Sequence, residues 1–384
     1  MITKLVLKNF KCFKEPEEFD FSQINVLSGI NGVGKSTIIQ ALLLIAQSVK
    51  DGDFPYLRLD GRYVNLGTFF DVLNAYSGEE TFSINISTCN GYEHHLFSSY
   101  RRPSSDENPW ADFYSLEEDG HDFFEENSED STDDENESVQ RSLGSTSALS
   151  VPKEFRYLYY IPADRKGPHN EEDIERAMDE FDIGLHGEHV INVLRLRGVS
   201  FQKQVEDALR EVLQDATVRV EENGAKAKLF LGAGNDTKTF KPTNVGFAYG
   251  YLLPIVMAAL LLPSNGLLFV ENPEAHLHEG AQSRLIKFLC RVASEKKFQV
   301  FIETHSEHIV NGLLVAVHDS ILPNDKIRVF HFGRVGNNHD VSMLSMGVEP
   351  GGQIRKTPDG FFDQVEKDLE VLTGIEDFKG RVND

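Results

Sequence analysis

One short segment, SGINGVGKST at residues 28 to 37, constrains the fold more than any other part of the sequence. It fits the pattern G-x-x-x-x-G-K-[ST] through Gly29, Gly34, Lys35 and Ser36. The apolar runs INVLSG and TIIQALLLIAQ flank it on its two sides. Glycines in this pattern free backbone N–H groups to surround phosphate oxygens at the positive end of a helix. The segment therefore predicts a strand, a phosphate-binding loop (P-loop) and a helix.

The residue types in this loop predict a site for ATP with magnesium. Lys35 is expected to meet the β and γ phosphates, and the Ser36 hydroxyl is expected to ligate Mg²⁺. The remaining predicted contacts to the nucleotide come from Asn31, Gly32, Gly34 and Thr37. Nucleotide binding is thus the first functional expectation.

A second segment, LLFVENPEAHLH at residues 267 to 278, predicts a buried strand that ends in polar residues. We expect this strand to lie beside the P-loop strand. Side chains alternate along a strand, so only one of Glu271 and Asn272 can point with the magnesium ligands, and Glu271 is predicted to take that role. Asn272 can orient a water molecule, but its amide cannot accept the proton. Hydrolysis is therefore expected to be slow.

Glu274 is the nearest carboxylate to this strand end and has two interpretations. It is a candidate general base for the attacking water, or it supports the loop after the strand without entering the chemistry. Thirty residues on, FQVFIETHSEHI predicts another buried strand followed by a helix, with His305 between them. Ligands bind at the carboxyl ends of strands in such sheets, so His305 is predicted to sense the γ-phosphate.

The stretch that contains these segments alternates helix and strand. Helices are expected at 246–262, 279–294 and 306–317, and strands at 266–271 and 298–303. This alternation predicts an α/β fold with parallel strands and helical crossovers. The long apolar run from Tyr251 to Val270 is interrupted by Pro254, Pro263 and Gly266, so we expect no membrane span.

The three elements in this order resemble the ABC-class ATPase heads of the SMC, RecF and overcoming-lysogenisation-defect type. The resemblance includes KLVLKNFKCFKE, PEAHLHEGAQSRL and ETHS, while YVNLGTFFDVL and YYIPADRKGP are similar to segments of small stand-alone members. GGQIRKTPDGFFDQVEKDL resembles an uncharacterised C-terminal domain of some members. The resemblance implies an ABC-type P-loop ATPase head: a mostly parallel sheet flanked by helices, an antiparallel β subdomain, and here a helical and acidic insertion.

The family's signature loop carries a serine and glycines that reach the nucleotide of a partner head. TNVGFAYGYLLPI matches in position and offers Gly246 and Gly250 at a helix start, without the serine. Backbone N–H groups at that helix start could still bind a phosphate. The resemblance implies a head-to-head homodimer around two nucleotides.

We divide the chain into four expected segments. They are the first part of the head with the P-loop (1–95), an insertion with a helical lid (96–215), the second part of the head (216–340) and a C-terminal extension (341–384). Within them we expect short strands near 63–70 and 82–89, an aromatic strand at 155–163, helical periodicity over 171–214, a hairpin at 217–231, a β-rich stretch at 327–345 and a terminal helix.

Residues 104–138 contain fifteen Asp or Glu and no Lys or Arg, and they account for most of the net charge of −23. Their composition predicts a disordered or loosely helical surface segment. The alternative is a tail that mimics DNA or docks a partner. Its anchors would be the interleaved aromatic residues Trp110, Phe113, Tyr114, Phe123 and Phe124.

Direct contact with DNA or RNA is left open by the sequence. Arg195, Arg197 and Lys203 could line a basic groove with Arg165 and Lys166, or they could form a solvated helix face. The cysteines Cys12, Cys89 and Cys290 lie far apart without metal-ligand spacing, which is typical of reduced thiols in a cytoplasmic protein.

The preferred functional hypothesis is a slow ATPase that dimerises on nucleotide and acts as the switch of a DNA-maintenance or anti-phage defence complex. Because few residues follow His305, the effector, a nuclease or similar, is expected to be a separate polypeptide. The alternative is an ATP-gated scaffold that clamps a partner protein or nucleic acid without turnover. A small-molecule or RNA kinase is disfavoured, since a monomeric kinase needs neither the signature-like helix nor the ETHS segment.

Overall fold

The centre of the molecule is a six-stranded sheet that carries the P-loop strand. We describe a computed structural model of the chain, and it covers residues 1–89, 93–103, 110–118, 121–124, 153–166, 169–175, 177–232, 238–334, 341–358 and 360–373. Neighbouring strands of the central sheet are parallel except at one edge, where β16 is antiparallel to β15. Its order is β16 (Val341–Met346), β15 (Ile327–Arg334), β3 (Ile24–Gly29), β14 (Gln299–Glu303), β13 (Leu267–Glu271) and β9 (Leu158–Ile161).

The strand order corrects one sequence expectation. β13 was expected beside the P-loop strand β3, but β14 lies between them and pairs with both. Helical crossovers imply parallel strands without fixing which strands become neighbours. The strand expectations at 155–163, 266–271, 298–303 and 327–345 are confirmed by β9, β13, β14 and the β15–β16 pair.

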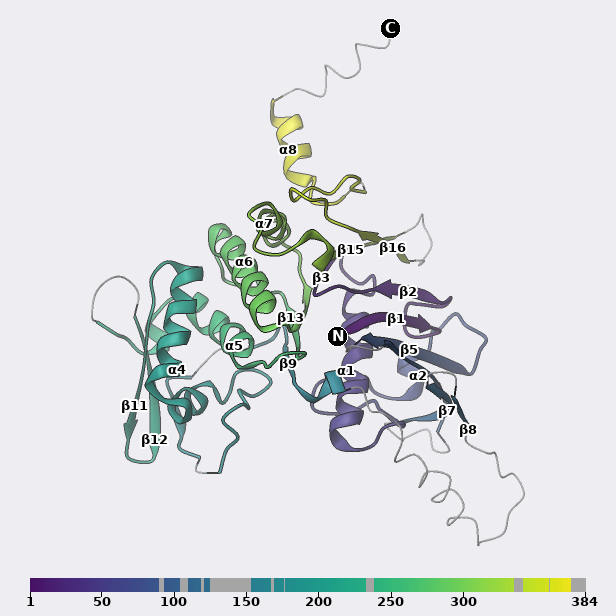
Figure 1. Cartoon of the computed structure of the whole chain (residues 1–384), viewed down its shortest axis with the longest axis horizontal. Helices are drawn as coiled ribbons and strands as arrows, with labels where there is room; N and C mark the ends of the chain where they lie inside the picture. Colours follow the sequence, from purple (N-terminus) through teal and green to yellow (C-terminus); the bar gives the residue numbers. More distant parts are fainter. Residues whose placement is uncertain are drawn as a thin grey trace.

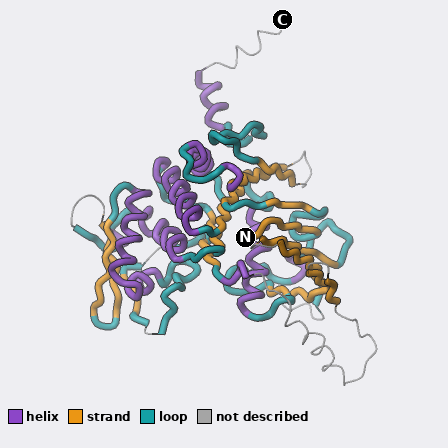
Figure 2. The backbone as a smooth tube through the Cα atoms, viewed as in Figure 1, coloured by secondary structure: helices purple, strands orange, loops and turns teal. Residues whose placement is uncertain are grey.

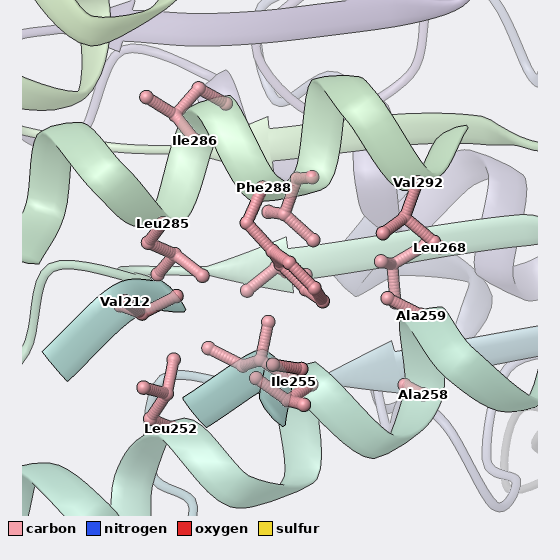
Figure 3. Close-up of a cluster of buried hydrophobic side chains, with 14 of the residues drawn as sticks. Val212, Leu252, Ile255, Ala258, Ala259, Leu268, Leu285, Ile286, Phe288 and Val292 are labelled. Carbon is pink, nitrogen blue, oxygen red and sulfur yellow. The ribbon is translucent and has the colours of Figure 1, made fainter. Parts of the chain in front are cut away.

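Helices cover both faces of this sheet, and the alternation of side chains explains how. Leu267 and Phe269 of β13 enter the hydrophobic cluster that includes helix α1 (Lys35–Asp51). Leu268 and Val270 enter the opposite cluster with α5 (Phe247–Leu261), α6 (Glu279–Lys296) and α7 (Glu307–His318). Figure 3 shows part of this second cluster, where side chains of α5 and α6 interdigitate over β13.

An antiparallel sheet forms the subdomain that the resemblance predicted. Figure 2 shows its strands on one side of the central sheet and most of the helices on the other. Its order is β2 (Glu17–Asp20), β1 (Ile2–Lys8), β5 (Thr81–Cys89), β6 (Glu93–Arg101), β7 (Trp110–Glu118) and β4 (Leu57–Arg58), with β8 (His121–Phe124) paired to β7. The short strand expected near 63–70 is wrong, because a capping box at Thr68 begins the short helix α2 (Phe69–Val72) there.

The acidic segment is partly ordered, which corrects the expectation of disorder. Residues 110–118 and 121–124 form β7 and β8, and Ala111 is fully buried opposite Leu57 of β4. The guanidinium of Arg58 lies 5.3 Å from the centre of the Trp110 ring. Backbone pairing and one apolar position thus outweigh the local composition. Residues 104–109, 119–120 and 125–138 lie outside the described residues.

A separate three-stranded sheet accompanies the longest helix. It has the order β10 (Glu171–Asp173), β12 (Lys226–Gly232) and β11 (Thr217–Asn223), so the expected hairpin is confirmed. Helical structure expected over 171–214 is confirmed only from α4 (Val190–Leu213), which kinks at Gly198 (φ 74°, ψ −172°). The described single turns of 3₁₀ helix are η2 (Lys153–Arg156), η3 (Pro242–Asn244) and η4 (Asn324–Lys326).

The expected insertion at 96–215 is divided among three parts of the fold. β6 to β8 belong to the antiparallel sheet, and β9 belongs to the central sheet. β10 belongs to the three-stranded sheet, and α4 packs beside that sheet and against α5 and α6 (Figure 1). The terminal helix is confirmed as α8 (Gln364–Thr373), which projects from the body of the molecule in Figure 1. In the part of the chain described here, no helix is long and apolar enough to cross a membrane.

Candidate nucleotide-binding site

The P-loop joins β3 to α1 as predicted, and its glycines adopt backbone angles that other residues rarely take. Gly29, Gly32 and Gly34 have φ of 129°, 72° and 96°. Lys35 Nζ donates hydrogen bonds to the carbonyls of Gly29 (3.1 Å) and Ile30 (2.6 Å) within the loop. The ammonium group therefore lies inside the curve of the loop, where a phosphate would meet it. Burial lowers the pKa of Lys35.

Two of these glycines also lie where a side chain would collide with neighbouring segments. A Cβ on Gly29 would lie 2.1 Å from the carbonyl oxygen of Phe332 in β15. A Cβ on Gly34 would lie 2.4 Å from Cys12 Sγ. Cys12 follows β1, so the first strand and its turn press directly against the start of α1. The shape of the P-loop thus depends on contacts with β15 and with the turn after β1, which are far apart in the sequence.

Glu303, at the end of β14, was missed by sequence reasoning and lies at the centre of the site. The hydroxyl of Ser36, the predicted magnesium ligand, lies near enough to this carboxylate to lower its pKa. Only 8% of Glu303 is exposed, and its Oε2 is buried with no hydrogen-bond partner. Burial raises the pKa of Glu303, and the carboxylate of Glu271 raises it further. A usable signal existed, since a carboxylate at the end of a buried strand is costly unless it has a function.

Glu271 lies in register with Glu303 at the end of β13, so the two side chains share a face. Its two oxygens are bound to the next strand along. Tyr160 Oη donates to Oε1 (3.0 Å), and the Ala163 N–H donates to Oε2 (3.3 Å). Burial raises the pKa of Glu271. The carboxylate is thus tied to β9 and the turn that follows it, on the side away from β3.

Arg165 holds the backbone at the end of β13. Its Nη1 donates to the carbonyl of Glu271 and its Nη2 to the carbonyl of Asn272, each at 2.9 Å. Only 1% of Arg165 is exposed, and burial lowers its pKa to about 10. Asn272 has φ of 44°, and its N–H donates to the carbonyl of Glu303 (2.8 Å). Asn272 therefore leaves the strand in a left-handed turn that Arg165 and β14 fix.

Glu274 is bound to the segment that carries the predicted γ-phosphate sensor. Its Oε2 accepts a hydrogen bond from Thr304 Oγ1 (2.8 Å) and its Oε1 accepts one from the His305 N–H (2.9 Å). Ser306 then caps α7, with its hydroxyl oxygen accepting from the N–H groups of His308 and Ile309. The loop after β13 and the turn after β14 are thus joined through one carboxylate.

His305 lies exposed at the edge of the P-loop, where it was predicted to be. Partial burial together with the Lys35 ammonium lowers the pKa of its ring, while the nearby backbone of Gly29 acts in the opposite direction. A cavity of ≈ 420 Å³ opens here beside Ile30 and Asn31. His331 of β15 and Phe362, near the start of α8, complete its wall. The described residues include no group of three or more His, Cys, Asp or Glu side chains placed to hold a metal ion by themselves.

Gly246 and Gly250 lie at the start of α5, as predicted. They line a cavity that is separate from the P-loop of the same protomer. Gly246 caps the helix, and the neighbouring Phe247 is 74% exposed. Both glycines line a cavity of ≈ 730 Å³ that also contains Lys166 and Lys241. That cavity includes no residue of the P-loop. One protomer therefore does not bring these glycines and its own P-loop into one cavity.

Comparison with known proteins identifies the family. The model of the family described as "AAA domain, putative AbiEii toxin, Type IV TA system" matches residues 24–311, which is most of the chain. The chain belongs to this family. A second model, described as a protein of unknown function (DUF3696), matches residues 322–372, the part that includes β15, β16 and α8. No curated protein is similar enough to count as a match.

Solved structures agree on the fold of this AAA-family chain. The SMC head domain from Thermotoga maritima has a TM-score of 0.50 at 14% identity, with 91% of this chain and 99% of that chain covered. An SMC head bound to the C-terminal winged-helix domain of ScpA has a TM-score of 0.53 at 13% identity, with 91% and 98% covered. An SMC head with an extended coiled coil, bound to the C-terminal domain of ScpA from Pyrococcus furiosus, gives 0.50 at 13%, with 98% and 99% covered. The fold is that of an ABC-type P-loop ATPase head.

Four of the five basic residues considered for contact with nucleic acid have acidic or backbone partners in this AAA-family chain. Arg195 pairs with Glu222 (3.5 Å), and Arg197 pairs with Glu180 (3.6 Å). Lys203 pairs with Glu206 and Asp207 on its own helix, at 2.8 and 3.0 Å. Arg165 is buried under the end of β13. These four side chains are therefore engaged by other groups of the protein, while Lys166 is exposed in the cavity that contains Lys241. Contact with nucleic acid stays a prediction.

Proposed function

We propose that this protein binds ATP with Mg²⁺, hydrolyses it slowly, and dimerises head to head on the nucleotide. The observation that carries the proposal is the P-loop itself. Lys35 lies within a cradle of left-handed glycines, with the Ser36 hydroxyl beside the buried carboxylate of Glu303. Asn31, Gly32, Gly34, Lys35, Ser36 and Thr37 would surround the phosphates.

The residues present fit a magnesium ion of the kind that accompanies ATP. Mg²⁺ keeps several water ligands and needs only one or two protein oxygens besides the phosphates, so a complete protein cage is unnecessary. The Ser36 hydroxyl and a carboxylate at the strand ends would supply those oxygens. When bound, the ion would neutralise charge that develops on the phosphate oxygens.

Slow turnover is proposed from the groups around the attacking water. Asn272 can orient a water but cannot accept its proton. Glu274 already accepts two hydrogen bonds from the Thr304–His305 segment, which favours a supporting role over that of general base. His305, at the edge of the P-loop, would report the γ-phosphate to the loop that follows β13.

Dimerisation is proposed because the P-loop and the glycines at the start of α5 lie apart in one protomer. The cavity that contains Gly246 and Gly250 lacks any P-loop residue. Backbone N–H groups at the start of the 15-residue helix α5 would suit the phosphates of a second protomer's nucleotide. In this arrangement the dimer forms with ATP and opens after hydrolysis.

For its biological role we propose a switch subunit in an anti-phage defence or DNA-maintenance complex with a separate effector protein. Support comes from the family, whose description includes a toxin of the AbiEii type and a toxin–antitoxin system. The SMC heads in two of the similar structures are bound to parts of ScpA, which supports a protein partner. Mass spectrometry of the native complex would identify that partner, and a complex without any effector protein would contradict this role.

A non-hydrolysing ATP-gated scaffold is the second candidate. It is favoured because Asn272 cannot accept a proton and because Glu274 already accepts hydrogen bonds from Thr304 and the His305 N–H. Two measurements on the same samples separate the candidates: ATPase rate per protomer against protein concentration, and light scattering with ATP–Mg²⁺ or ADP–Mg²⁺. The switch requires a rate that rises with concentration and dimers only with ATP. Lys35→Ala serves as the nucleotide-free control, and Lys50→Ala, at the other end of α1, as the matched lysine control. Equal dimer content with ATP and ADP would contradict the switch.

A further inference from the structure

A further cavity, of ≈ 500 Å³, lies at the free edge of the central sheet. β9 is the last strand of that sheet, and within the described chain it pairs only with β13. The cavity lies along β9, between the end of α1 and the segment 179–185. Its volume is within the range of sites for small molecules, about 300–1,000 Å³. The edge of the sheet therefore has room for a small ligand.

This cavity is separate from the site proposed for ATP. Lys50, near the end of α1, lines it, while Lys35 begins the same helix in the P-loop. A rise of about 1.5 Å per residue places these two positions about 22 Å apart along the helix. The lining includes no residue of the P-loop. A molecule that fills this cavity is therefore a second ligand.

Aromatic rings surround the edge strand in this cavity. The lining includes Tyr63, Tyr157, Tyr159, Tyr160 and Phe181. Tyr160 packs with the hydrophobic cluster on the α1 side of the sheet, and Tyr159 packs with the opposite cluster. Tyr157 and Phe181 are 49% and 47% exposed, so two rings are open to solvent. Exposed flat rings of this kind stack with the planar bases of nucleotides.

Two of the three cations that line the cavity are engaged by protein groups. Arg62 pairs with Asp182 (2.7 Å). The ammonium of Lys50 donates a hydrogen bond to the hydroxyl of Tyr63. These contacts close the wall on the α1 side and leave the third cation, Arg156, for a ligand.

Arg156 is exposed, and its guanidinium lies 5.6 Å from the centre of the Tyr157 ring. Among the described residues it forms no ion pair. Asp179 accepts a hydrogen bond from the Phe181 N–H (3.0 Å), and a carboxylate has further acceptor sites for an amino group. The cavity thus combines an arginine, an acceptor and stacking surfaces. These groups match the phosphate, the exocyclic amine and the ring of a nucleotide.

One side chain joins this cavity to the end of β13. Tyr160 lines the cavity, and its hydroxyl donates to the Glu271 carboxylate (3.0 Å). A ligand that stacks beside β9 meets the Tyr160 ring, and a shift of that ring changes the hydrogen bond to Glu271. Coupling between two sites requires such a contact, one that differs between the liganded and unliganded states.

We propose that this cavity binds a free nucleotide, distinct from the ATP of the P-loop, which regulates the ATP site. Its base stacks on the aromatic wall beside Asp179, and its phosphate meets Arg156. Tyr160 and Glu271 carry the effect of binding to the ATP site. The regulatory part rests on the proposed ATP binding, whereas the binding of the second nucleotide does not.

Binding is tested on full-length Lys35→Ala protein, so that the P-loop does not contribute. AMP, GMP, CMP and UMP are each titrated by calorimetry, and UMP should bind weakest because its base lacks an exocyclic amine. Adding Arg156→Gln should weaken binding at least ~10-fold, the usual scale for losing a hydrogen bond to a charged group. Phe181→Leu, which removes a ring and keeps an apolar side chain, should also weaken it. Arg219→Gln, at an exposed arginine of β11 paired with Glu221 (2.9 Å), is the matched control and should bind normally.

Thermal denaturation of each variant confirms folding before titration. No binding by any of the four nucleotides, or equal binding in Arg156→Gln and Arg219→Gln, would overturn the proposal. Tightest binding by UMP would overturn the role of Asp179. A 5′-phosphorylated single-stranded DNA of eight nucleotides is titrated in parallel. If it binds more tightly than every free nucleotide and depends on Arg156, the cavity receives the end of a strand and the assignment to a free nucleotide is wrong.

Regulation is tested on protein with an intact P-loop, by the affinity for ATP with and without the tightest-binding monophosphate. That affinity should change at least ~5-fold, the lower end of typical coupling between sites. Arg156→Gln should abolish the effect. Tyr160→Phe should reduce it while the monophosphate still binds, because the ring stays and the bond to Glu271 is lost. An unchanged effect in Tyr160→Phe would overturn this route. Protein that binds the monophosphate and not ATP would refute the proposed function and leave the second site standing.

Discussion

The Tyr160 hydroxyl donates a hydrogen bond of 3.0 Å to the Glu271 carboxylate, and this bond joins the edge strand β9 to β13. Tyr160→Phe would leave Glu271 Oε1 without that donor. Loss of one partner of a buried hydrogen bond costs about 1–3 kcal/mol, so urea denaturation should show a destabilisation of that size. Magnesium-dependent ATP affinity should be retained, because the variant keeps the Glu271 carboxylate and its hydrogen bond from the Ala163 N–H. Tyr157→Phe, on a side chain that is 49% exposed, is the control. A loss of metal dependence in Tyr160→Phe would show that this hydrogen bond positions Glu271 for the metal ion.

Glu274→Gln tests whether the acid after β13 is a base or a support. The amide can accept through only one atom, so the Thr304 hydroxyl and the His305 N–H can no longer each donate to a separate oxygen. Loss of a general base typically slows the chemical step by ~10²-fold or more. We expect a smaller reduction, below about 10-fold, together with a lower unfolding midpoint. Single-turnover hydrolysis and thermal denaturation on the same samples measure both.

A second variant, Thr304→Val, decides how a slow hydrolysis rate in Glu274→Gln should be interpreted. Thr304→Val removes one donor to Glu274 and leaves its carboxylate in place. If Glu274 is a support, the two variants should be slowed to a similar extent. A rate that collapses in Glu274→Gln and stays normal in Thr304→Val would instead identify Glu274 as the base.

Ala111→Asp tests the ordered part of the acidic segment. Ala111 is fully buried between β7 and β4, so an unpaired carboxylate there would be desolvated. We expect a loss of at least ~2 kcal/mol in the free energy of unfolding, while Asp112→Ala, at the neighbouring half-buried position, should change it by less than about 1 kcal/mol. Normal stability of Ala111→Asp would show that β7 contributes nothing to the folded state.

The sequence predicted the P-loop, the α/β rhythm and the positions of His305, Gly246 and Gly250, because each depends on local patterns. Strand order depends on how crossovers pass over the sheet, and no local pattern records it. The consequence was that Glu303 was taken as one more residue of a buried strand. The same limit applies to β7, where pairing with distant Leu57 and Arg58 outweighs an acidic composition.

Cysteine alkylation tests the placement of three segments at once. Cys89 is exposed, Cys12 is partly buried beside Thr37, and Cys290 is buried in α6. Burial raises the pKa of Cys12, and it raises the pKa of Cys290 to about 12. The thiolate is the reactive form, so iodoacetamide at pH 8 should modify Cys89 first, then Cys12, and leave Cys290 intact in the folded protein. The rate at Cys12 should still rise above pH 9, because a raised pKa delays thiolate formation. Equal rates at the three sites by mass spectrometry would contradict this packing.

A matched pair of glycine variants separates backbone strain from collision in the P-loop. Gly32→Ala and Gly34→Ala both place a side chain on a residue with positive φ, at 72° and 96°. The Cβ on Gly32 would meet only the Arg334 side chain, at 3.9 Å. The Cβ on Gly34 would lie 2.4 Å from Cys12 Sγ, a distance that requires the start of α1 or the turn after β1 to move.

We therefore expect Gly32→Ala to lose about 1–2 kcal/mol of stability, the scale of left-handed strain, and Gly34→Ala to lose more. ATP affinity should fall further in Gly34→Ala, because displacement of α1 moves Lys35 and Ser36 together. Cys12→Ala removes the colliding sulfur, so the double variant should regain part of the lost stability, although the Phe13 ring remains 3.2 Å from the new Cβ. Denaturation of the two single variants and the double variant measures this coupling. Strict additivity of Gly34→Ala and Cys12→Ala would show that the turn after β1 does not press on the P-loop.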